Sequence, residues 1–261
     1  MVMRYFAGID SGALSTEAVV IDEKGRMIGE AVLLTGADPL SAVKRAYDTA
    51  LGKAELAEKD ISFVVATGYG RGRIPFASLE ITEISCHAKG MSYLFPKVRT
   101  IIDIGGQDTK AIRVNEEGKV VDFAMNDKCA AGTGRFLEVM ANALEVSLEE
   151  MGELALKAKR EVKVSSMCTV FAESEVVSLI AEGHPKEEIL LGVASAIADR
   201  TMGLIAKIGL IPDLAMSGGV AKNRAVVRAL AKKLKHKVHI PKEPQLVGAL
   251  GAALFAREKG G

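Results

Sequence analysis

Runs of apolar residues separated by polar, glycine-containing turns dominate two stretches of the chain. In each stretch an apolar run ends at an aspartate, Asp10 or Asp103, and a tight Gly turn, a second apolar run, a polar turn and a third run follow. This pattern predicts three strands in each stretch. Further strands are expected at 63–67, 161–164, 214–217 and 238–240, and helices at 40–58 and 134–143. The chain is therefore expected to be an α/β protein.

The two stretches are copies of one another. Asp10–Ala31 aligns with Asp103–Ala124 without a gap, and seven of 22 positions are identical. The match keeps its register over strand, turn, strand, turn and strand, and helix-forming sequence follows each copy. After the second copy, Ser147 and Glu150 have the spacing of a capping box at a helix start. The chain is expected to have two related halves.

Composition narrows the class of protein. The 261 residues are 49% hydrophobic and 26% charged, with a net charge of +1, so a large core is expected and a basic nucleic-acid surface is not. The uncharged stretch Gln245–Ala256 is too short to span a membrane. The N-terminus lacks the pattern of a signal peptide. We expect a soluble cytoplasmic protein that binds neither membrane nor nucleic acid.

The two Asp-x-Gly turns are typical of a site for nucleotide phosphates. Small turns let backbone N–H groups approach phosphate, and Asp10 and Asp103 would hold Mg²⁺. Gln107 is expected to orient the attacking water. A third turn, Gly218-Gly219, is expected to contact adenosine, and Gln245 the base. The expected phosphate contacts are Gly12, Ala13, Leu14, Ser15, Thr16, Gly105, Gly106 and Lys110.

The order of these three turns resembles the actin, Hsp70 and sugar-kinase superfamily. That resemblance implies a duplicated, ribonuclease H-like fold with ATP or ADP in a cleft between two lobes. The first lobe would be 1–97, with the helix 245–261 packing back on it, and the second lobe 98–244 would carry two cysteines. Walker A and G-x-G-x-x-G patterns are missing.

The chain has three cysteines and no C-x-x-C pair. Cys129 and Cys168 each precede a helical stretch and have small or hydroxyl neighbours. A helix N-terminus favours a thiolate and an anionic iron–sulfur cluster. One chain supplies two thiols, so a [4Fe–4S] cluster would need two chains related by a two-fold axis. From the residues alone, the alternative is that both are small buried side chains, which is the usual setting of an intracellular cysteine.

Seven stretches are similar to the ATP-dependent activators of 2-hydroxyacyl-CoA dehydratases and to the ATPase subunits of benzoyl-CoA reductases. They are GIDSGA, ATGYGRG, IDIGGQDTK, MNDKCAAGTGRFLEVMA, CTVFAESEV, SGGVAKN and GALGAAL. The resemblance implies a homodimeric ATPase in which Cys129 and Cys168 hold one shared [4Fe–4S] cluster. It also implies low-potential electron transfer into a dehydratase, with a ferredoxin or flavodoxin as donor.

Cys86 and His87 are expected to be structural residues, and two positions of the first turn depart from the family pattern. Cys86 has the helical spacing of a core residue, and His87 beside it is expected to be a structural hydrogen-bonding residue. Many family members have Ser and Lys where this chain has Ala13 and Glu17. Glu17 is expected to point away from the phosphates or to act through metal or water, while Lys110 supplies the missing charge.

Three alternatives remain open. The chain could be a fixed ATPase subunit of an aromatic-ring reductase, although its short length favours the detachable activator. It could be a small-molecule kinase of the same fold without a cluster, which would leave the cysteine segments unexplained. An actin-like filament protein is the last alternative, and the sequence offers no cue for it.

Overall fold

The computed structural model describes residues 3–165 and 168–261, and the chain divides into two compact units. Unit 1 comprises Met1–Val98, Val114–Val121 and Pro241–Gly261, and unit 2 comprises Arg99–Arg113 and Asp122–Ile240. The strands are β1 (Tyr5–Ser11), β2 (Ser15–Asp22), β3 (Met27–Leu34), β4 (Ile61–Thr67), β5 (Leu79–Glu80), β6 (Thr100–Ile104), β7 (Thr109–Val114), β8 (Val120–Asn126), β9 (Leu214–Ser217) and β10 (Val238–His239). The α-helices are α1 (Pro39–Lys53), α2 (Glu83–Leu94), α3 (Gly134–Leu144), α4 (Leu148–Leu156), α5 (Thr169–Ala181), α6 (Lys186–Ile208), α7 (Arg224–Leu234) and α8 (Val247–Gly260). Short 3₁₀ helices are η1 (Glu58–Asp60), η2 (Arg71–Arg73), η3 (Gly219–Lys222) and η4 (Pro244–Leu246).

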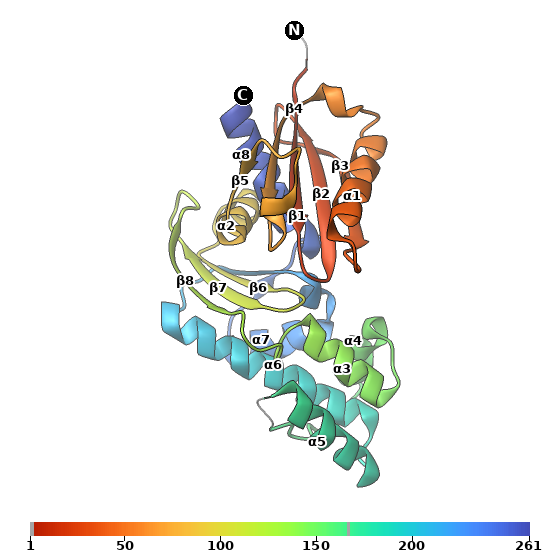
Figure 1. The fold of residues 1–261 in the computed structure, drawn as a ribbon. Helices are drawn as coiled ribbons and strands as arrows, with labels where there is room; N and C mark the ends of the chain where they lie inside the picture. The colour runs from red at the N-terminus through yellow and green to blue at the C-terminus, as the bar shows by residue number, and fades with distance from the viewer. Residues whose placement is uncertain (1–2, 166–167) are drawn as a thin grey trace. The chain divides into compact units, whose positions relative to one another are not determined.

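Unit 1 is built on a five-stranded sheet in the order β3-β2-β1-β4-β5, with β1 antiparallel to β2 and parallel to β4. Helix α1 packs on β2 and β3, while α8 packs on β1, β4 and α2 (Figure 1). Alternate residues of the strands face opposite layers: Ala7 belongs to the core under α1, and Phe6 to the core under α8. A Cβ at Gly8 would overlap the carbonyl oxygen of Ala249, so this glycine permits close packing of α8 on β1.

Unit 2 has a second five-stranded sheet, in the order β10-β9-β6-β7-β8, packed with helices α3 to α7 around one core. Phe136 and Met140 of α3, Ile189 and Ile197 of α6 and Ile102 of β6 are completely buried there. In the part of the chain that the structure describes, α6 alone has the length and apolarity of a membrane span. Because 61% of its most apolar window is buried inside the protein, α6 is accounted for as a core helix.

The structure confirms the repeat. Both copies form three neighbouring strands, with the first two antiparallel, and β1–β2 pairs Asp10 with Glu17 just as β6–β7 pairs Asp103 with Lys110. The expected capping box is also present, because Ser147 Oγ accepts from Glu150 N at 3.3 Å and Glu150 Oε2 accepts from Ser147 N at 3.3 Å.

Two predicted elements are corrected. Residues 161–164 are not a strand: Val162 N donates to Glu188 O at 3.2 Å, and its carbonyl lies where a Cβ on Gly192 would be, so the segment packs on α6 instead of joining a sheet. Its apolar residues are explained by burial against this helix. The helix expected to reach residue 58 ends at Lys53, since Glu55 adopts a left-handed backbone with φ of 56°.

Candidate functional site

The first Asp-x-Gly turn follows β1 in unit 1 and is held by hydroxyl groups. Thr16 Oγ1 lies 2.9 Å from Thr35 Oγ1, and Thr35 Oγ1 donates to Gly12 O at 2.9 Å. Thr35 N donates to Leu14 O at 3.0 Å. Ala13 is exposed at the tip of the turn. The turn therefore presents its backbone on a fixed support, as a phosphate-binding turn requires.

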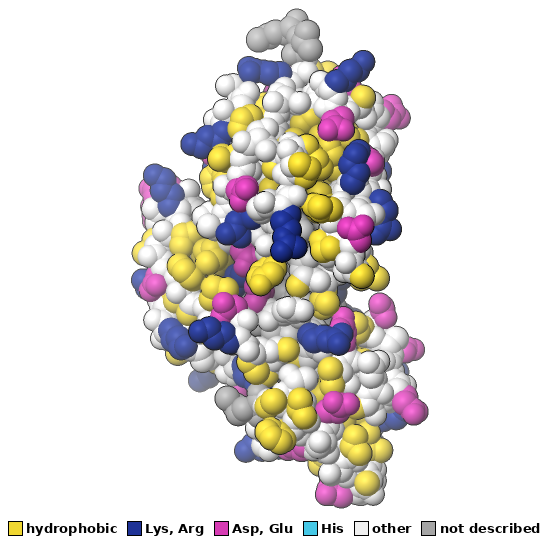
Figure 2. Space-filling model, in the orientation of Figure 1, with side chains coloured by type: hydrophobic (Ala, Val, Ile, Leu, Met, Phe, Trp, Pro, Cys, Tyr) yellow, Lys and Arg dark blue, Asp and Glu magenta, His cyan; other side chains and the backbone are white. Residues whose placement is uncertain are grey.

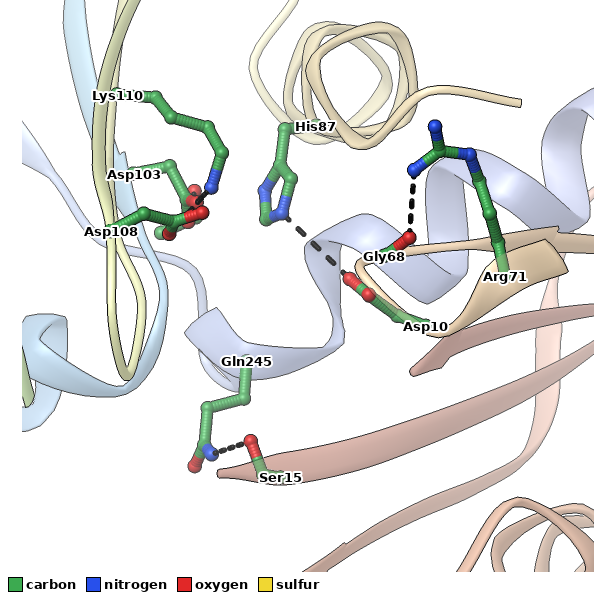
Figure 3. Close-up of polar contacts among 10 residues, drawn as sticks. Asp10, Ser15, Gly68, Arg71, His87, Asp103, Asp108, Lys110 and Gln245 are labelled. Atoms are coloured by element: carbon green, nitrogen blue, oxygen red, sulfur yellow. Dashed lines mark hydrogen bonds and ion pairs between the residues drawn. The ribbon is translucent and has the colours of Figure 1, made fainter. Parts of the chain in front are cut away.

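Asp10 is buried at the end of β1, where only glycines leave it room. A Cβ on Gly68 would overlap Asp10 Oδ1, and a Cβ on Gly248 at the start of α8 would overlap Oδ2. His87 Nε2 of α2 lies 3.8 Å from Oδ2, and Figure 3 shows the imidazole directed at the carboxylate. The carboxylate is thus fixed by α2, α8 and the loop after β4. His87 is a structural neighbour of Asp10, consistent with the role expected from the sequence.

Glu17 lies opposite Asp10 in the β1–β2 register and is only 4% exposed. Paired residues of neighbouring strands place their side chains on the same face of a sheet. Glu17 is therefore a second buried carboxylate on the Asp10 face and does not point into solvent. Gln245, in η4 of the same unit, donates through Nε2 to Ser15 Oγ at 3.4 Å, so it contacts the start of β2 (Figure 3).

The second turn, in unit 2, surrounds Asp103 with polar partners. Lys110 Nζ lies 3.3 Å from Asp103 Oδ2 and 2.7 Å from Asp108 Oδ1, and Ser217 Oγ donates to Asp103 Oδ1 at 2.9 Å. The Lys110 side chain is 2% exposed and points at both carboxylates in Figure 3. Its charge is balanced by these two groups, and its geometry orients Asp103. Gln107 is exposed in the same turn.

Removal of the Lys110 charge is expected to destabilise unit 2. Lys110→Met leaves two carboxylates without their shared cation in a buried site, which typically costs about 3–5 kcal/mol. Urea unfolding should show this loss. Lys110→Met combined with Asp108→Asn should recover part of it, because one uncompensated charge is gone. A single variant as stable as the wild-type chain would contradict the role of this ion pair.

The Gly218-Gly219 turn follows β9, beside the second aspartate. Gly218 has φ of 82°, and a Cβ there would overlap Ile104 O and lie 3.0 Å from Asp103 Oδ1. Only glycine meets both demands. Gly219 is exposed and begins η3. Unit 2 thus brings together Asp103, Gly105, Gly106, Lys110, Gly218 and Gly219, and unit 1 holds Asp10, Gly12, Ala13, Leu14, Ser15, Thr16 and Gln245.

Hydrogen bonds connect the second turn to the segment of Cys129. Gly105 O accepts from Gly134 N, and Gly106 O from Arg135 N, both at 2.9 Å, so the start of α3 rests on the turn. Thr109 Oγ1 donates to Gly132 O at 3.4 Å. Cys129 is exposed ahead of this helix. A displacement of the turn would therefore be transmitted to the thiol segment.

Cys168 is the N-cap residue of α5 and is partly exposed. The carboxylate of Glu175, within the same helix, accepts from Ser165 N at 2.9 Å and from Ser165 Oγ at 2.8 Å. These bonds tie the chain before Cys168 to α5. The amide groups at the helix start are the groups that stabilise a thiolate.

Cys129 and Cys168 are the two thiols of one chain that could bind a metal cluster. Among the described residues, no group of three or more His, Cys, Asp and Glu side chains could hold a metal ion. Cys129 also lines a cavity of about 600 Å³ in unit 2, together with Arg200 of α6. Two accessible thiols outside any disulfide, Cys168 at the start of α5 and Cys129 in the loop before α3, fit half of a four-thiolate cluster. A second chain would be needed for the other half.

Cys86 differs from these thiols and confirms the assignment to the core. It is completely buried in α2, and burial raises the pKa of its thiol to about 12. Metal-free native protein should therefore react with a thiol reagent at Cys129 and Cys168, with Cys86 labelled only after unfolding, since at pH 8 only about one Cys86 in 10⁴ is a thiolate. Mass spectrometry of the labelled peptides checks this. Rapid native labelling of Cys86 would contradict it.

Residues 7–256 match the family described as the BadF/BadG/BcrA/BcrD ATPase family. The chain belongs to this ATPase family. The match covers nearly the whole chain and confirms the family that the sequence motifs resemble.

Relatives of this chain and solved structures of similar fold align along nearly their full length. The activator of lactoyl-CoA dehydratase from Anaerotignum propionicum is 50% identical over 97% of this chain and 98% of its own. The structure of the activator of 2-hydroxyisocaproyl-CoA dehydratase from Clostridium difficile, with bound ADPNP, has a TM-score of 0.94 at 42% identity and covers 98% of this chain and 95% of its own. A ROK hexokinase from Thermus thermophilus has a TM-score of 0.55 at 16% identity over 98% and 99% of the two chains. The fold is that of actin-like ATPases and sugar kinases, as predicted.

Several contacts of the site lie outside the sequence predictions. Two hydrogen bonds join residues that are distant in the sequence: Asp103 and Ser217 are 114 positions apart, and Ser165 and Glu175 are 10 positions apart. The cavity likewise brings Arg200 of α6 to the segment of Cys129. Asp108 was visible as a charged residue in the second turn. No local signal in the sequence identifies the other partners.

Proposed function

We propose that this chain is an ATP-dependent reductive activator. Two copies would share one [4Fe–4S] cluster held by Cys129 and Cys168 of each, and ATP hydrolysis would be coupled to low-potential one-electron transfer into a 2-hydroxyacyl-CoA dehydratase. The observation that carries the proposal is the pair of 2.9 Å hydrogen bonds from the start of α3 to Gly105 O and Gly106 O. They join a phosphate-type turn to a thiol segment within one unit.

The nucleotide chemistry is assigned to the two Asp-x-Gly turns. Asp10 and Asp103 would hold Mg²⁺, directly or through water, because carboxylates bind this cation. The cation would offset the negative charge of the phosphates of ATP. Gln107 is exposed and polar, and it orients the attacking water. Backbone N–H groups of both turns bind phosphate oxygens. Gly218 and Gly219 receive adenosine, and Gln245 contacts the base.

The cluster chemistry is assigned to the two accessible cysteines. When bound, the cluster would supply a one-electron reductant of low potential. The helix start at α5 and the segment before α3 hold the thiolates, and a second copy of the chain completes the donor set. Exposed apolar side chains next to Cys168 support contact with another chain: Val170, Phe171 and Val177 of α5 are 65%, 68% and 53% exposed. Figure 2 shows hydrophobic side chains at the surface of this end of unit 2.

The coupling is assigned to the turn and α3. ATP and ADP differ at the γ-phosphate, and a nucleotide shifts a conformational equilibrium only through contacts that differ between the two states. Movement of Gly105 and Gly106 on binding or hydrolysis would carry the N-terminus of α3, and with it the segment of Cys129. This two-state movement would decide when the dimer docks on its partner.

The proposed partners are the dehydratase and a ferredoxin or flavodoxin as electron donor, all in the cytoplasm. The dehydratase is supported by the similarity along the whole chain to activators of lactoyl-CoA and 2-hydroxyisocaproyl-CoA dehydratases. A chain that serves instead as a fixed subunit of a benzoyl-CoA reductase would co-purify with large partner subunits.

The test is ATP-driven activation of a purified dehydratase component. The anaerobically prepared chain, a low-potential reductant and Mg²⁺ are mixed with the dehydratase, and dehydration is followed with ATP, with ADP and with ADPNP. Activation is expected with ATP alone. Iron-free protein that phosphorylates a small-molecule acceptor and never activates the dehydratase would support the kinase alternative and refute the proposal.

A further inference from the structure

Arg200 is a half-buried cation in the wall of the cavity that Cys129 also lines. It projects from the middle of α6, and its guanidinium carbon lies 5.3 Å from the centre of the Phe136 ring in α3. A Cβ added at Gly132 would lie 3.2 Å from Arg200 Cδ, so the arginine stem rests on the loop between Cys129 and α3. The side chain is therefore held on two sides by the thiol segment.

Both thiols act electrostatically on this arginine. Burial lowers the pKa of the Arg200 guanidinium, whereas the thiolates of Cys129 and Cys168 act in the opposite direction and raise it. The shared cavity and the contact with Gly132 agree with this effect, because they place Arg200 beside the segment that carries Cys129. Two sulfurs on separate segments thus share one cationic neighbour.

The other charged groups around the cavity are placed differently. Lys163 and Lys207 line it but are exposed, so solvent screens their charges. Asp199, beside Arg200 in sequence, has its carboxylate 2.7 Å from Lys233 Nζ. Among the cations that the structure describes in this cavity wall, Arg200 is the one that is partly buried, and its pKa responds to both thiolates.

We propose that Arg200 is a positioning residue that raises the reduction potential of the cluster held by Cys129 and Cys168; this inference rests on the proposed function. A cluster with four thiolate ligands is anionic, and the added electron makes it more so. A fixed positive charge stabilises the reduced form more than the oxidised form, and more strongly in a partly desolvated site than in water. Arg200 would thereby keep the cluster reducible by its electron donor.

The test compares charge-removing and charge-keeping variants. Arg200→Gln, Arg200→Lys and Lys207→Gln are prepared anaerobically, and the reduced fraction of the cluster is followed by electron paramagnetic resonance during a redox titration. Arg200→Gln should shift the midpoint to a more negative potential, by about the 59 mV that corresponds to a tenfold change in the reduced-to-oxidised ratio for one electron. Arg200→Lys should shift it much less. Lys207→Gln removes an exposed charge from the same cavity and should leave it near the wild-type value.

Iron content and thermal unfolding of each metal-free variant accompany the titration. An Arg200→Gln chain that folds but retains no iron, beside an Arg200→Lys chain that does, would also support the role of the charge. Equal midpoint potentials for wild type and Arg200→Gln would overturn the proposal. Equal shifts of the midpoint, or equal loss of iron, in Arg200→Gln and Arg200→Lys would also overturn it, because the effect would then come from packing and not from charge. A wild-type chain without iron would instead refute the proposed function itself.

Discussion

Asp10→Asn is expected to lower the turnover number for ATP hydrolysis by at least about 100-fold. Asparagine has nearly the same size, so it keeps the contacts with Gly68 and Gly248, but it removes the negative charge assigned to Mg²⁺. Loss of groups that only support a metal ligand typically costs 10–100-fold in activity or affinity, so loss of a ligand should cost at least the upper end. The measurement is steady-state phosphate release at saturating ATP.

Asp22→Asn is the matched control for Asp10→Asn. Asp22 is a buried aspartate at the end of β2, and its Oδ1 accepts from Lys24 N and Arg26 N at 2.9 Å each. Its replacement should lower the free energy of unfolding, because these hydrogen bonds hold the turn after β2. ATP turnover should stay within about twofold of wild type, because Asp22 has no proposed contact with the phosphates. Turnover by Asp10→Asn within about threefold of wild type, at equal stability, would remove Asp10 from the hydrolytic site.

Gly134→Pro is expected to uncouple ATP hydrolysis from dehydratase activation. Proline is tolerated at the first position of a helix, and the preceding Thr133 already has the extended backbone that proline requires, with φ of −111° and ψ of 179°. It lacks the N–H that binds Gly105 O, and its Cδ takes the place of that hydrogen, so the Gly105 carbonyl, 2.9 Å from the nitrogen, must move away. Leaving a carbonyl without its partner costs about 1–3 kcal/mol, which corresponds to about a 5- to 150-fold change in a coupling constant. Activation should fall in this range while ATP hydrolysis and iron content are retained.

Gly134→Ala separates the lost hydrogen bond from the added side chain. Its Cβ would lie 3.3 Å from Gly105 O, as the proline Cβ would, but the N–H remains. Gly134→Ala should therefore activate the dehydratase much better than Gly134→Pro. Equal activation by both variants, or an equal loss in both, would show that the hydrogen bond does not carry the coupling.

The order of elements and the repeat could be predicted because both depend on local sequence. Each copy shows the alternation of apolar residues, with glycines at the turns, within about 20 residues. The structure confirms the strands that this pattern predicts, β1 to β3 and β6 to β8. The prediction of a strand at 161–164 was wrong, because alternating apolar and polar residues indicate which side chains are buried but do not show that the segment pairs with another strand. Val162 and Val164 contact α6 at Gly192, and the described part of this segment is not assigned to a strand.

Site residues on conspicuous turns could also be predicted, whereas their long-range partners could not. Asp10, Asp103 and the glycines stand out beside strand ends. The positions of the Glu17 and Lys110 side chains follow from the strand register in the structure, which pairs each residue with an aspartate of the neighbouring strand. In unit 1 the paired side chain is a second carboxylate, and in unit 2 it is a cation. The duplicated turns therefore differ in charge, although their backbone pattern is the same.

The central claim is a cluster shared by two chains through Cys129 and Cys168, and native mass spectrometry of anaerobically prepared protein tests it most directly. We expect a dimer carrying about four irons and four sulfides, or about two irons per chain. Cys129→Ala and Cys168→Ala should lose this mass and the brown colour, whereas Cys86→Ala should keep both. Monomers free of iron, or a dimer whose iron survives Cys168→Ala, would rule out a cluster shared through these two cysteines.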